Sequence, residues 1–561
     1  MDASLIDPGS LLAAYTGATA RLEQLDFSQA LWERRLDVWT SDDEVRKKIA
    51  NRLGWLGALD FVEPLVGRLA TFAAAVRADG FTDVVLLGMG GSSLAPEVMR
   101  QVLGVAPGFP RFRMLDSVDP DAVRQAMGNA ATSLFVLASK SGSTIEPNVM
   151  AAEARRRLLA AGHAEPGARF VAITDEGTAL HRRAIDERFR DVFVNPSDIG
   201  GRYSALSLFG MVPAALMGVD LARFLRLARA MESACRSGSV ATNPGVALGA
   251  LMAAGSLNGR DKLTLLLPER LRSFGLWVEQ LVAESTGKQG KGVVPITGEP
   301  ASAHFGDDRV AVVVTLPGDQ ADAGMLARVH AAALPTATLS MPEVAGLGAE
   351  FLRWEVATAT AGLLLGINPF DEPNVQQAKD ATRALLDVYE QQHRLPAPEP
   401  AASVSGARLT VSRAAESHRP GIAATDFLQQ IGDGDYFCLL AYLPPDEEVW
   451  ASALAALREG VSTACGCATM FGYGPRYLHS TGQLHKGGAN NGVFVVVTAD
   501  PTEDLPIPDQ PFSFGILELA QGLGDFQSLD RTNRRALHVH LPRRDPASLQ
   551  AVWNALLGVR S

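Results

Sequence analysis

Short runs of consecutive apolar residues alternate along the chain with longer stretches in which apolar residues recur every three or four positions. Between residues 83 and 196 the apolar runs are DVVLLG, RFRMLD, SLFVLAS, RFVAIT and DVFVNP, and helical patterns separate them. Runs of this length predict strands that are buried on both faces, and the stretches between them predict crossover helices. The pattern therefore predicts an α/β fold: a mostly parallel sheet in a three-layer sandwich.

The same alternation returns twice further along the chain. DKLTLLLP and DRVAVVVTL predict strands of a second α/β unit, and YFCLLAYLP, NNGVFVVVTAD and ALHVHLP predict strands of a third, smaller segment. A stretch rich in Pro, Ala and Ser separates the second unit from the third, as linkers do. The expected division is a helical segment at 1–55, α/β domains at 56–225 and 226–393, a linker at 394–420 and a C-terminal α/β segment at 421–561.

Composition and charge narrow the possible partners and the compartment. The 561 residues carry a formal net charge of −11 without a basic block, which argues against nucleic acid as a partner. The longest apolar run, Val356 to Ile367, is too short to span a bilayer. Four scattered cysteines do not suggest a disulfide framework, and the N-terminus lacks the pattern of a signal peptide. We expect a soluble cytoplasmic protein with no membrane partner.

Two of the predicted strands end in turns rich in glycine and hydroxyl groups. LLGMGGSSLAP contains Gly91 and Ser92, and ASKSGSTIEP contains Ser139, Lys140, Ser141 and Thr144 just before a predicted helix. Backbone N–H groups, hydroxyls and a lysine at a helix N-terminus suit a phosphomonoester dianion. A single helix cap would need one hydroxyl rather than four, so we favour an anion site here.

Nucleotide sites fit these turns less well. GMGGSS offers G-x-G with Asp116 ending the next strand, but a lone G-x-G is a weak signal and leaves SKSGST without a role. The stretch around GKQGKG is not a P-loop. Val282 stands where the first glycine of that motif belongs, and Gln289 stands where it needs Ser or Thr. The sequence therefore favours neither a dinucleotide site nor a P-loop.

Catalytic candidates lie further along the chain. Gln280 and Glu284 share one face of the helix in EQLVAES, and Glu284 falls in the last turn before Gly287. The helix dipole opposes a carboxylate at that position, which should raise its pKa toward the range of a general base. In IGGRYSALS, Gly200 and Gly201 allow a ligand to approach the backbone closely, beside the guanidinium of Arg202.

These motifs together resemble those of the glucose-6-phosphate isomerase family, which has the sugar-isomerase fold. The resemblance rests on LGMGGSSLAP, ASKSGSTIEP, IGGRYSALS, EQLVAES and NPFDEPNVQQAK, which occur in the family's order. IANRLGWL, YLHSTGQLHKGG and LAQGLGDFQSL resemble the isomerase half of transaldolase–isomerase fusions. The resemblance implies reversible conversion of glucose 6-phosphate to fructose 6-phosphate through a cis-enediolate, without metal or organic cofactor.

The resemblance also assigns roles to individual residues. Glu284 would move a proton between C1 and C2, Arg202 would stabilise the enediolate, and His479 with Lys379 would open the pyranose ring. The substrate, including its phosphate, would be bound by Gly91, Ser92, Ser139, Lys140, Ser141, Thr144, Gly201, Gln280 and Glu372. The family carries a glutamine where this chain has Glu372, so an extra negative charge would lower affinity or move the pH optimum.

Several alternatives stay open at this point. The ring-opening histidine of the family lies between the base and the lysine in chain order, which His304 satisfies and His479 does not. The surroundings of His479, LHSTGQ, match the family's motif, and we favour it for that reason. A sugar-phosphate-sensing domain without catalysis, a phosphosugar isomerase of other specificity and a nicotinamide dehydrogenase are the rival functions. A homodimer is possible.

Overall fold

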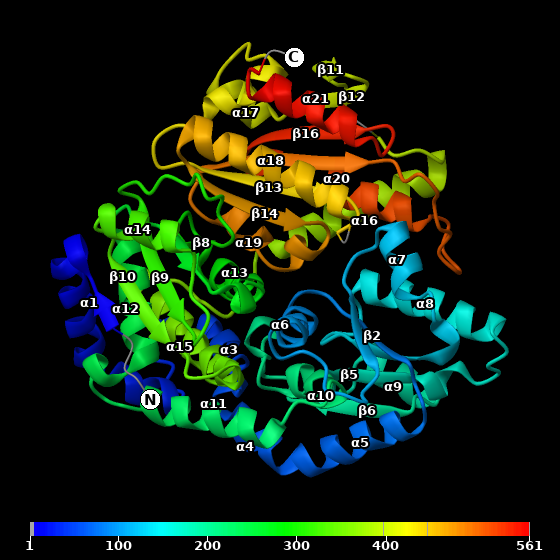
Figure 1. Cartoon of the computed structure of the whole chain (residues 1–561), viewed down its shortest axis with the longest axis horizontal. Coiled ribbons are helices and arrows are strands. Elements are labelled where there is room, and N and C mark those ends of the chain that lie inside the picture. The colour runs from blue at the N-terminus through cyan, green and yellow to red at the C-terminus, as the bar shows by residue number, and fades with distance from the viewer. Residues whose placement is uncertain (1–4, 397, 446, 560–561) are drawn as a thin grey trace.

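A computed structural model of the chain describes residues 5–396, 398–445 and 447–559, and these residues form three sheets with helices packed against them. In Figure 1 the sheet of the C-terminal third lies at the top, with the first sheet at the lower right and the second at the left. The predicted fold class, α/β with mostly parallel sheets, is confirmed.

The first sheet contains all five strands that the apolar runs predicted. They are β2 (Asp83–Leu87), β3 (Arg111–Leu115), β4 (Ser133–Ala138), β5 (Phe170–Asp175) and β6 (Asp191–Asn195), ordered β3-β2-β4-β5-β6 and parallel throughout. Alternate residues of β2 enter two different cores, Val84 and Leu86 on one face and Val85 and Leu87 on the other. This is the three-layer arrangement that continuous apolar strands predicted.

Strand order in the first sheet reverses direction between β2 and β4. The chain leaves β2 for β3 on one side, and it then returns to form β4 on the other side of β2. In open α/β sheets, ligands bind outside the carboxyl ends of the strands at such a switch point. The two turns that we singled out, residues 88–93 and 139–144, follow β2 and β4 and therefore lie together there.

The second sheet has the order β1-β10-β9-β7-β8. Its strands are β7 (Lys262–Leu266), β8 (Val294–Ile296), β9 (Arg309–Thr315), β10 (Thr336–Ser340) and β1 (Leu5–Asp7). All pairings are parallel except that of β1, which lies antiparallel along β10. The N-terminal segment thus adds a strand to the second sheet before its helices α1 (Leu12–Gln24), α2 (Phe27–Trp32) and α3 (Asp43–Ala50).

The third sheet is larger than the sequence predicted. Six strands run in the order β11-β12-β16-β15-β13-β14, against five in each of the other sheets. They are β11 (Ala402–Val404), β12 (Ala407–Val411), β13 (Tyr436–Tyr442), β14 (Ala468–Tyr473), β15 (Gly492–Ala499) and β16 (Arg535–Leu541). The stretch expected to be a linker, 394–420, holds β11, β12 and α17 (Arg413–His418), because β12 pairs antiparallel with β16. The division into domains otherwise stays a prediction.

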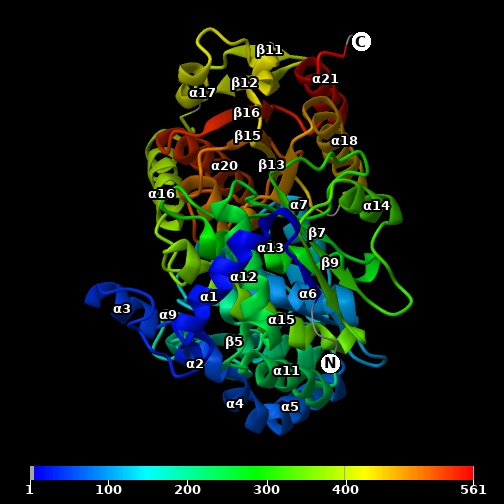
Figure 2. The ribbon, with the colours of Figure 1, turned by 90° about the vertical axis from the view of Figure 1, so that its left-hand side faces the viewer.

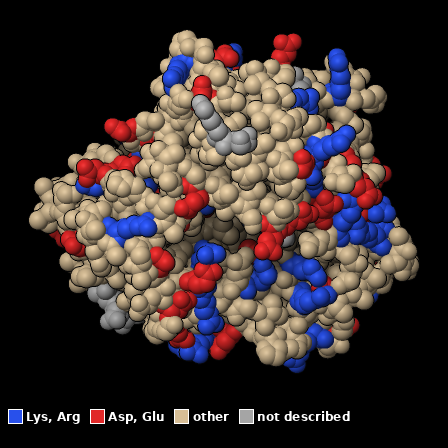
Figure 3. Space-filling model, turned by 45° about the horizontal axis from the view of Figure 1, so that its top comes forward, with Lys and Arg blue, Asp and Glu red and all other residues tan. Residues whose placement is uncertain are grey.

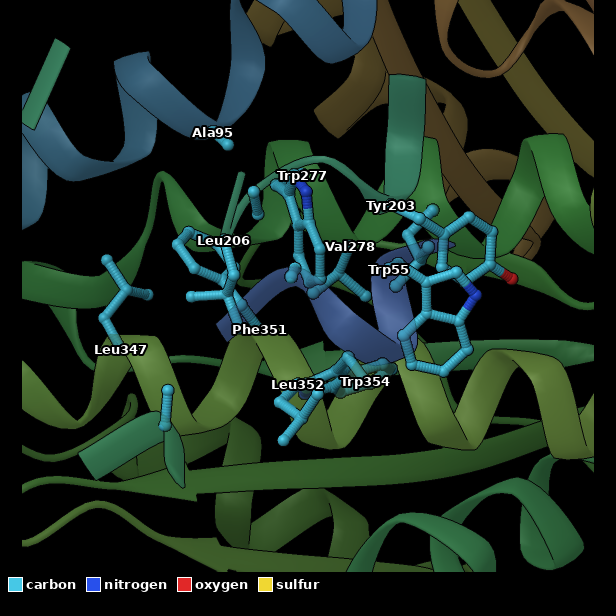
Figure 4. Close-up of a cluster of buried hydrophobic side chains, with 14 of the residues drawn as sticks. Trp55, Ala95, Tyr203, Leu206, Trp277, Val278, Leu347, Phe351, Leu352 and Trp354 are labelled. Carbon is cyan, nitrogen blue, oxygen red and sulfur yellow. The ribbon is translucent and has the colours of Figure 1, made fainter. Parts of the chain in front are cut away.

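The helix that carries Glu284 lies deep in the protein. Every residue of α13 (Phe274–Thr286) except Leu276 is buried. Figure 4 shows Trp277 of α13 beside Phe351, and their ring centroids are 4.7 Å apart, edge to face. Phe351 belongs to α15 (Leu347–Leu365), which is buried along its whole length. Aromatic packing on this scale holds α13 rigidly, so the side chains in its last turn are positioned by the core.

On the face seen in Figure 3, acidic and basic side chains lie among one another. Within the described residues, none of the helices is both long enough and apolar enough to cross a membrane.

Candidate active site

All thirteen residues predicted to bind substrate or act in catalysis line one cavity of about 480 Å³. The cavity opens at the carboxyl ends of β2 and β4 and is closed by α13, by the start of α16 (Val375–Gln392) and by a segment from the third sheet. The predicted residues in its wall are Gly91, Ser92, Ser139, Lys140, Ser141, Thr144, Gly201, Arg202, Gln280, Glu284, Glu372, Lys379 and His479. Residues that sequence reasoning did not assign also line it: Arg52, Met89, Gly90, Ala138, Pro147, Asp175, Thr178, Ser197 and Gly200.

The turn after β4 is shaped as an anion-binding loop. Its central Gly142 has φ +69, and a Cβ there would come within 2.6 Å of Leu180 N, so only glycine fits. Ser139 Oγ accepts a hydrogen bond from Gly142 N at 3.1 Å, and the Ser141 and Ser143 hydroxyls lie 2.9 Å apart. Thr144 is the N-cap of α8 (Ile145–Ala160), but its hydroxyl makes no capping bond. The hydroxyl and the first N–H groups of α8 are therefore available to an anion.

Lys140 lies in this wall, but its ammonium group is already held. It donates to the Ser197 carbonyl at 2.7 Å and pairs with the carboxylate of Asp175. Burial raises the pKa of Asp175, and the bond from Lys140 opposes that change. The lysine thus stands beside the hydroxyl loop with a neutralising partner that the sequence did not indicate.

The two glycine turns meet backbone to backbone. A Cβ on Gly91 would lie 2.2 Å from the carbonyl carbon of Gly201, so the two chains approach more closely than any side chain allows. This contact joins the turn after β2 to the 3-10 turn that carries Arg202 (Gly201–Tyr203). We had expected the glycines at 200–201 to let a ligand approach, which stays a prediction; what Gly201 allows in the structure is contact between the two turns.

Glu284 and Arg202 face each other inside the cavity. Glu284 Oε1 lies 3.4 Å from Arg202 Nη1, and Glu284 Oε2 accepts a hydrogen bond from Gln280 Nε2 at 3.3 Å. Burial raises the pKa of Glu284 most; Arg202 lowers it and Glu372 raises it, and the pKa stands at about 6. The expected direction holds, but burial is the first cause, whereas we had expected the helix dipole to be. A carboxylate with this pKa can both take and return a proton near neutrality.

Arg202 is held by five different groups. Its Nε donates to Ser285 Oγ at 2.8 Å, and its Nη2 donates to the carbonyls of Pro369 and Asp371, each at 2.9 Å. Its Nη1 faces both Glu284 and Glu372, the latter at 3.1 Å. The guanidinium side chain is only 3 % exposed. A buried cation with fixed geometry is suited to stabilising negative charge that develops on a ligand.

Lys288, which the sequence did not single out, helps to hold a loop beside the cavity. It donates to the Asn368 carbonyl at 2.6 Å and to Asp371 Oδ1 at 2.8 Å. Burial, together with the charge of Arg202, lowers its pKa to about 8. Lys288 and Arg202 therefore hold the same loop, residues 368–372, and this loop presents Glu372 to the cavity.

His479 ends a 3-10 turn (Arg476–His479) that follows β14 of the third sheet, and it meets a buried carboxylate of the first unit. Its Nε2 lies 2.9 Å from Oε1 of Glu146, which also accepts a hydrogen bond from Gln521 Nε2 at 2.7 Å. Burial alone would raise the pKa of Glu146, but the charge and hydrogen bond of His479 and the charge of Lys379 bring it below its usual range. An ionised Glu146 can only accept, so Nε2 of His479 carries a hydrogen and Nδ1 is left for a ligand.

An ion pair fixes the segment that carries His479. Arg476, three residues earlier, donates to both carboxylate oxygens of Asp116 at 2.7 and 2.8 Å. Asp116 follows β3, so the first sheet and the third are tied together directly beside the cavity. The carbonyl of His479 also accepts from Gln280 Nε2 at 2.8 Å, which links the histidine to the helix of Glu284.

Lys379 and the alternative histidine, His304, lie in different places relative to the cavity. Lys379 is exposed on α16 and reaches the cavity beside His479. His304 lies between β8 and β9 near Gly466 and is not among the residues that line the cavity. Of the two histidines that the sequence left open, the structure brings His479 to the other candidates.

This chain is similar to proteins of the phosphoglucose isomerase family. The family model described as phosphoglucose isomerase matches residues 68–312. Glucose-6-phosphate isomerase of Prochlorococcus marinus (strain MIT 9313) is 30 % identical over 422 residues, which span 68 % of this chain and 75 % of the relative. Glucose-6-phosphate isomerase of Citrifermentans bemidjiense is 28 % identical over 404 residues, 63 % of this chain and 74 % of that one.

Solved structures share the fold at lower identity. A hypothetical protein from Thermus thermophilus superposes with a TM-score of 0.57 at 24 % identity, covering 68 % of this chain and 99 % of that chain. A glucose-6-phosphate isomerase from Chlamydia trachomatis superposes with a TM-score of 0.50 at 21 % identity, covering 65 % and 78 %. The residues matched by the family model stop before Glu372, Lys379 and His479, so the cavity geometry carries the argument for those three.

Proposed function

The chain belongs to the phosphoglucose isomerase family, and on that premise we propose that it interconverts glucose 6-phosphate and fructose 6-phosphate. The observation that carries the proposal is the composition of one cavity. A hydroxyl loop at a helix N-terminus, a carboxylate with a pKa of about 6 and a fixed guanidinium all line it. These are the groups that an aldose–ketose isomerisation of a phosphorylated sugar requires.

Binding of the phosphate is assigned to the loop after β4. The hydroxyls of Ser139, Ser141 and Thr144 and the N–H groups at the start of α8 would surround the dianion. Lys140 adds positive charge at the side, with Asp175 holding its position. Ser92 and the N–H groups of the turn after β2 complete the enclosure from the neighbouring strand.

Proton transfer is assigned to Glu284. Its carboxylate would remove the proton from C2 of the open-chain aldose, leaving an enediolate, and return that proton to C1 to give the ketose. The electrons of the broken C–H bond form the C1–C2 double bond, and negative charge appears on the oxygen at C1. As the proton reaches C1, the hydroxyl at C2 gives its own proton to the oxygen at C1 and becomes the carbonyl of the ketose. Arg202 Nη1, 3.4 Å from Glu284 Oε1, is placed to stabilise that oxygen. Gln280 orients the carboxylate through its bond to Oε2.

Ring opening is assigned to His479. Protonated on Nδ1, the imidazole would donate this proton to the ring oxygen as the bond from C1 to that oxygen breaks. The hydroxyl at C1 would release its proton to water and become the carbonyl of the open-chain aldose. Glu146 accepts the Nε2–H throughout and so stabilises the imidazolium before the transfer. Lys379, whose charge already acts on Glu146, adds positive charge on the same side of the cavity.

The direct test is turnover of fructose 6-phosphate by the purified protein, coupled to glucose-6-phosphate dehydrogenase. We expect steady production of glucose 6-phosphate without added metal or nicotinamide cofactor beyond that of the coupling enzyme. A sensing domain would bind the sugar phosphate without turnover. The pair of Glu284 and Arg202 argues against a sensing domain, because binding alone needs neither group. An isomerase of other specificity would prefer a different sugar, which parallel assays with mannose 6-phosphate would reveal.

The pH dependence tests the role of Glu372. The base must be ionised, so kcat/KM should rise as the pH passes upward through the pKa of Glu284, about 6. Because Glu372 raises that pKa, Glu372→Gln should move the acid limb of the profile to lower pH. Glu269→Gln, at an exposed position paired with Arg272, should leave the profile unchanged. An unmoved acid limb in Glu372→Gln would contradict the coupling.

The partner class that we propose is a small sugar phosphate, in the cytoplasm, where the four free cysteines would stay reduced. We also propose that any homodimer has two independent sites, since one chain supplies the carboxylate, the guanidinium and the histidine of the cavity. Mixing Glu284→Gln with His479→Ala protein should then give no more activity than the two variants show separately. Recovered activity after mixing would mean that His479 serves the site of a second copy.

A further inference from the structure

A separate cavity of about 300 Å³ lies where the end of α16 meets the third sheet and α20 (Phe514–Arg531). None of the thirteen candidate site residues lines it. Figures 1 and 2 show α16 and α20 next to each other beside the third sheet. Its polar lining consists mainly of cationic and imidazole side chains, with Arg394, Arg408, His393, His538 and His540 among them.

The floor of this cavity is a patch of the third sheet. Arg408 and Thr410 of β12 stand in register with His540 and His538 of β16. The hydroxyl of Thr498 lies 2.8 Å from His538 Nε2 and 2.9 Å from His540 Nδ1, so one buried hydroxyl orients both rings. Burial, with the neighbouring charge of Arg408, lowers the pKa of His538 to about 3, and that ring is neutral.

Positive charge on this floor is not balanced by protein groups. Arg394 and Arg408 are exposed, and the guanidinium group of neither makes an ion pair or hydrogen bond with a described residue. Asp500 is the only carboxylate among the described residues of the lining, and it lies 3.6 Å from His540 Nε2. His540 Nε2 is buried and has no hydrogen-bond partner among the described residues. Two guanidinium groups without a partner among the described residues, in the same cavity as an unpartnered imidazole nitrogen, favour an anionic ligand.

The walls add an apolar surface for the body of such a ligand. Ile516, Leu519 and Leu523 recur at helical spacing along one face of α20 and line the cavity. On the other side, the ring of Tyr389 meets His393 edge to face, with centroids 6.4 Å apart. An apolar wall with a few convergent polar groups at a junction between units is typical of a small-molecule site.

We propose that this cavity binds a small organic molecule with two anionic groups, one phosphate or carboxylate for each of Arg394 and Arg408. Its carbon chain would lie against the leucines of α20. The site is distinct from the isomerase cavity, and the proposal does not depend on the catalytic roles assigned above. Both of its helices also connect to the catalytic candidates: Lys379 on α16 lines the isomerase cavity, and Gln521 on α20 donates to Glu146, the partner of His479.

The test is a calorimetric titration of the full chain with 3-phosphoglycerate, which carries a phosphate and a carboxylate on three carbons. A saturating equilibrium mixture of glucose 6-phosphate and fructose 6-phosphate occupies the isomerase cavity throughout. We expect one saturable site per chain in the wild type and binding weakened at least tenfold in Arg408→Ala. The matched control Arg226→Ala removes an equally exposed arginine on α11 (Leu221–Cys235) and should bind as the wild type does.

Turnover of fructose 6-phosphate reports that each variant is folded. If Arg408→Ala is not folded, Arg394→Ala carries the same expectation. The proposal is overturned if the wild type shows no saturable binding beside the sugar phosphates, or if a folded Arg408→Ala or Arg394→Ala protein binds as tightly as the wild type. Equal weakening in Arg226→Ala would also overturn it, since the effect would then come from overall charge.

Discussion

Replacing Glu284 with glutamine is expected to lower kcat for fructose 6-phosphate by about 10³- to 10⁴-fold, the upper part of the range for a general base. Glutamine keeps the shape of the side chain and the contact with Gln280, but its amide cannot take a proton from carbon. The folded state should survive, because the substitution replaces a buried, partly ionised carboxyl by a neutral group. The measurement is kcat by the coupled assay, with thermal unfolding to establish the fold.

The same helix offers a matched control. Glu279 is buried, its pKa is raised to about 7 by burial, and it bonds Thr297 Oγ1 at 2.5 Å, but it does not line the cavity. Glu279→Gln should therefore retain kcat within about twofold, as changes away from the reacting groups do. Turnover within tenfold of the wild type in Glu284→Gln would remove Glu284 as the base while leaving the proposed reaction intact.

Replacing His479 with alanine is expected to lower kcat by about 10²-fold, because the ring oxygen then loses its proton donor. Glu146→Gln should give a smaller loss, since the imidazole remains but its Nε2–H partner is no longer an anion. The double variant should be little worse than His479→Ala, because the two residues act as one unit. The measurement is kcat for the three variants and for His304→Ala, which should match the wild type.

Binding of an open-chain analogue separates ring opening from proton transfer. A five-carbon aldonate 5-phosphate has a carboxylate in place of the enediolate and cannot use the ring-opening histidine. His479→Ala should bind it as tightly as the wild type does, while Arg202→Lys should bind it more weakly. If His479→Ala protein turns over fructose 6-phosphate at the wild-type rate, another acid in the cavity donates the proton that opens the ring.

Much of the candidate site was predictable because it is encoded in contiguous stretches. Apolar runs of four or five residues locate the buried strands, and the glycine and hydroxyl residues that follow β2 and β4 mark where those strands end. Carboxyl ends of parallel strands meet at one edge of a sheet, so the two turns had to lie together. Glu284 was visible through its position in the last turn of a helix with an apolar face.

Other parts of the site depend on contacts that no local pattern encodes. Glu146 and His479 are 333 positions apart, and Arg476 is 360 positions from Asp116. Glu146 reads in the sequence as an ordinary acidic residue in the first turn of a helix, where the dipole alone would favour it. Only the packing of the third unit against the first makes it the partner of a histidine.

The sequence by itself determined the α/β class, the hydroxyl loop and thirteen of the residues that line the cavity, because residue spacing controls short-range geometry. The tertiary structure decided which histidine joins them, the pairing of Lys140 with Asp175, and the strands within the expected linker. It also decided why the pKa of Glu284 is raised, since burial depends on what α15 and the third unit place around α13. Desolvation and ion pairing act through space, and the order of residues along the chain does not contain them.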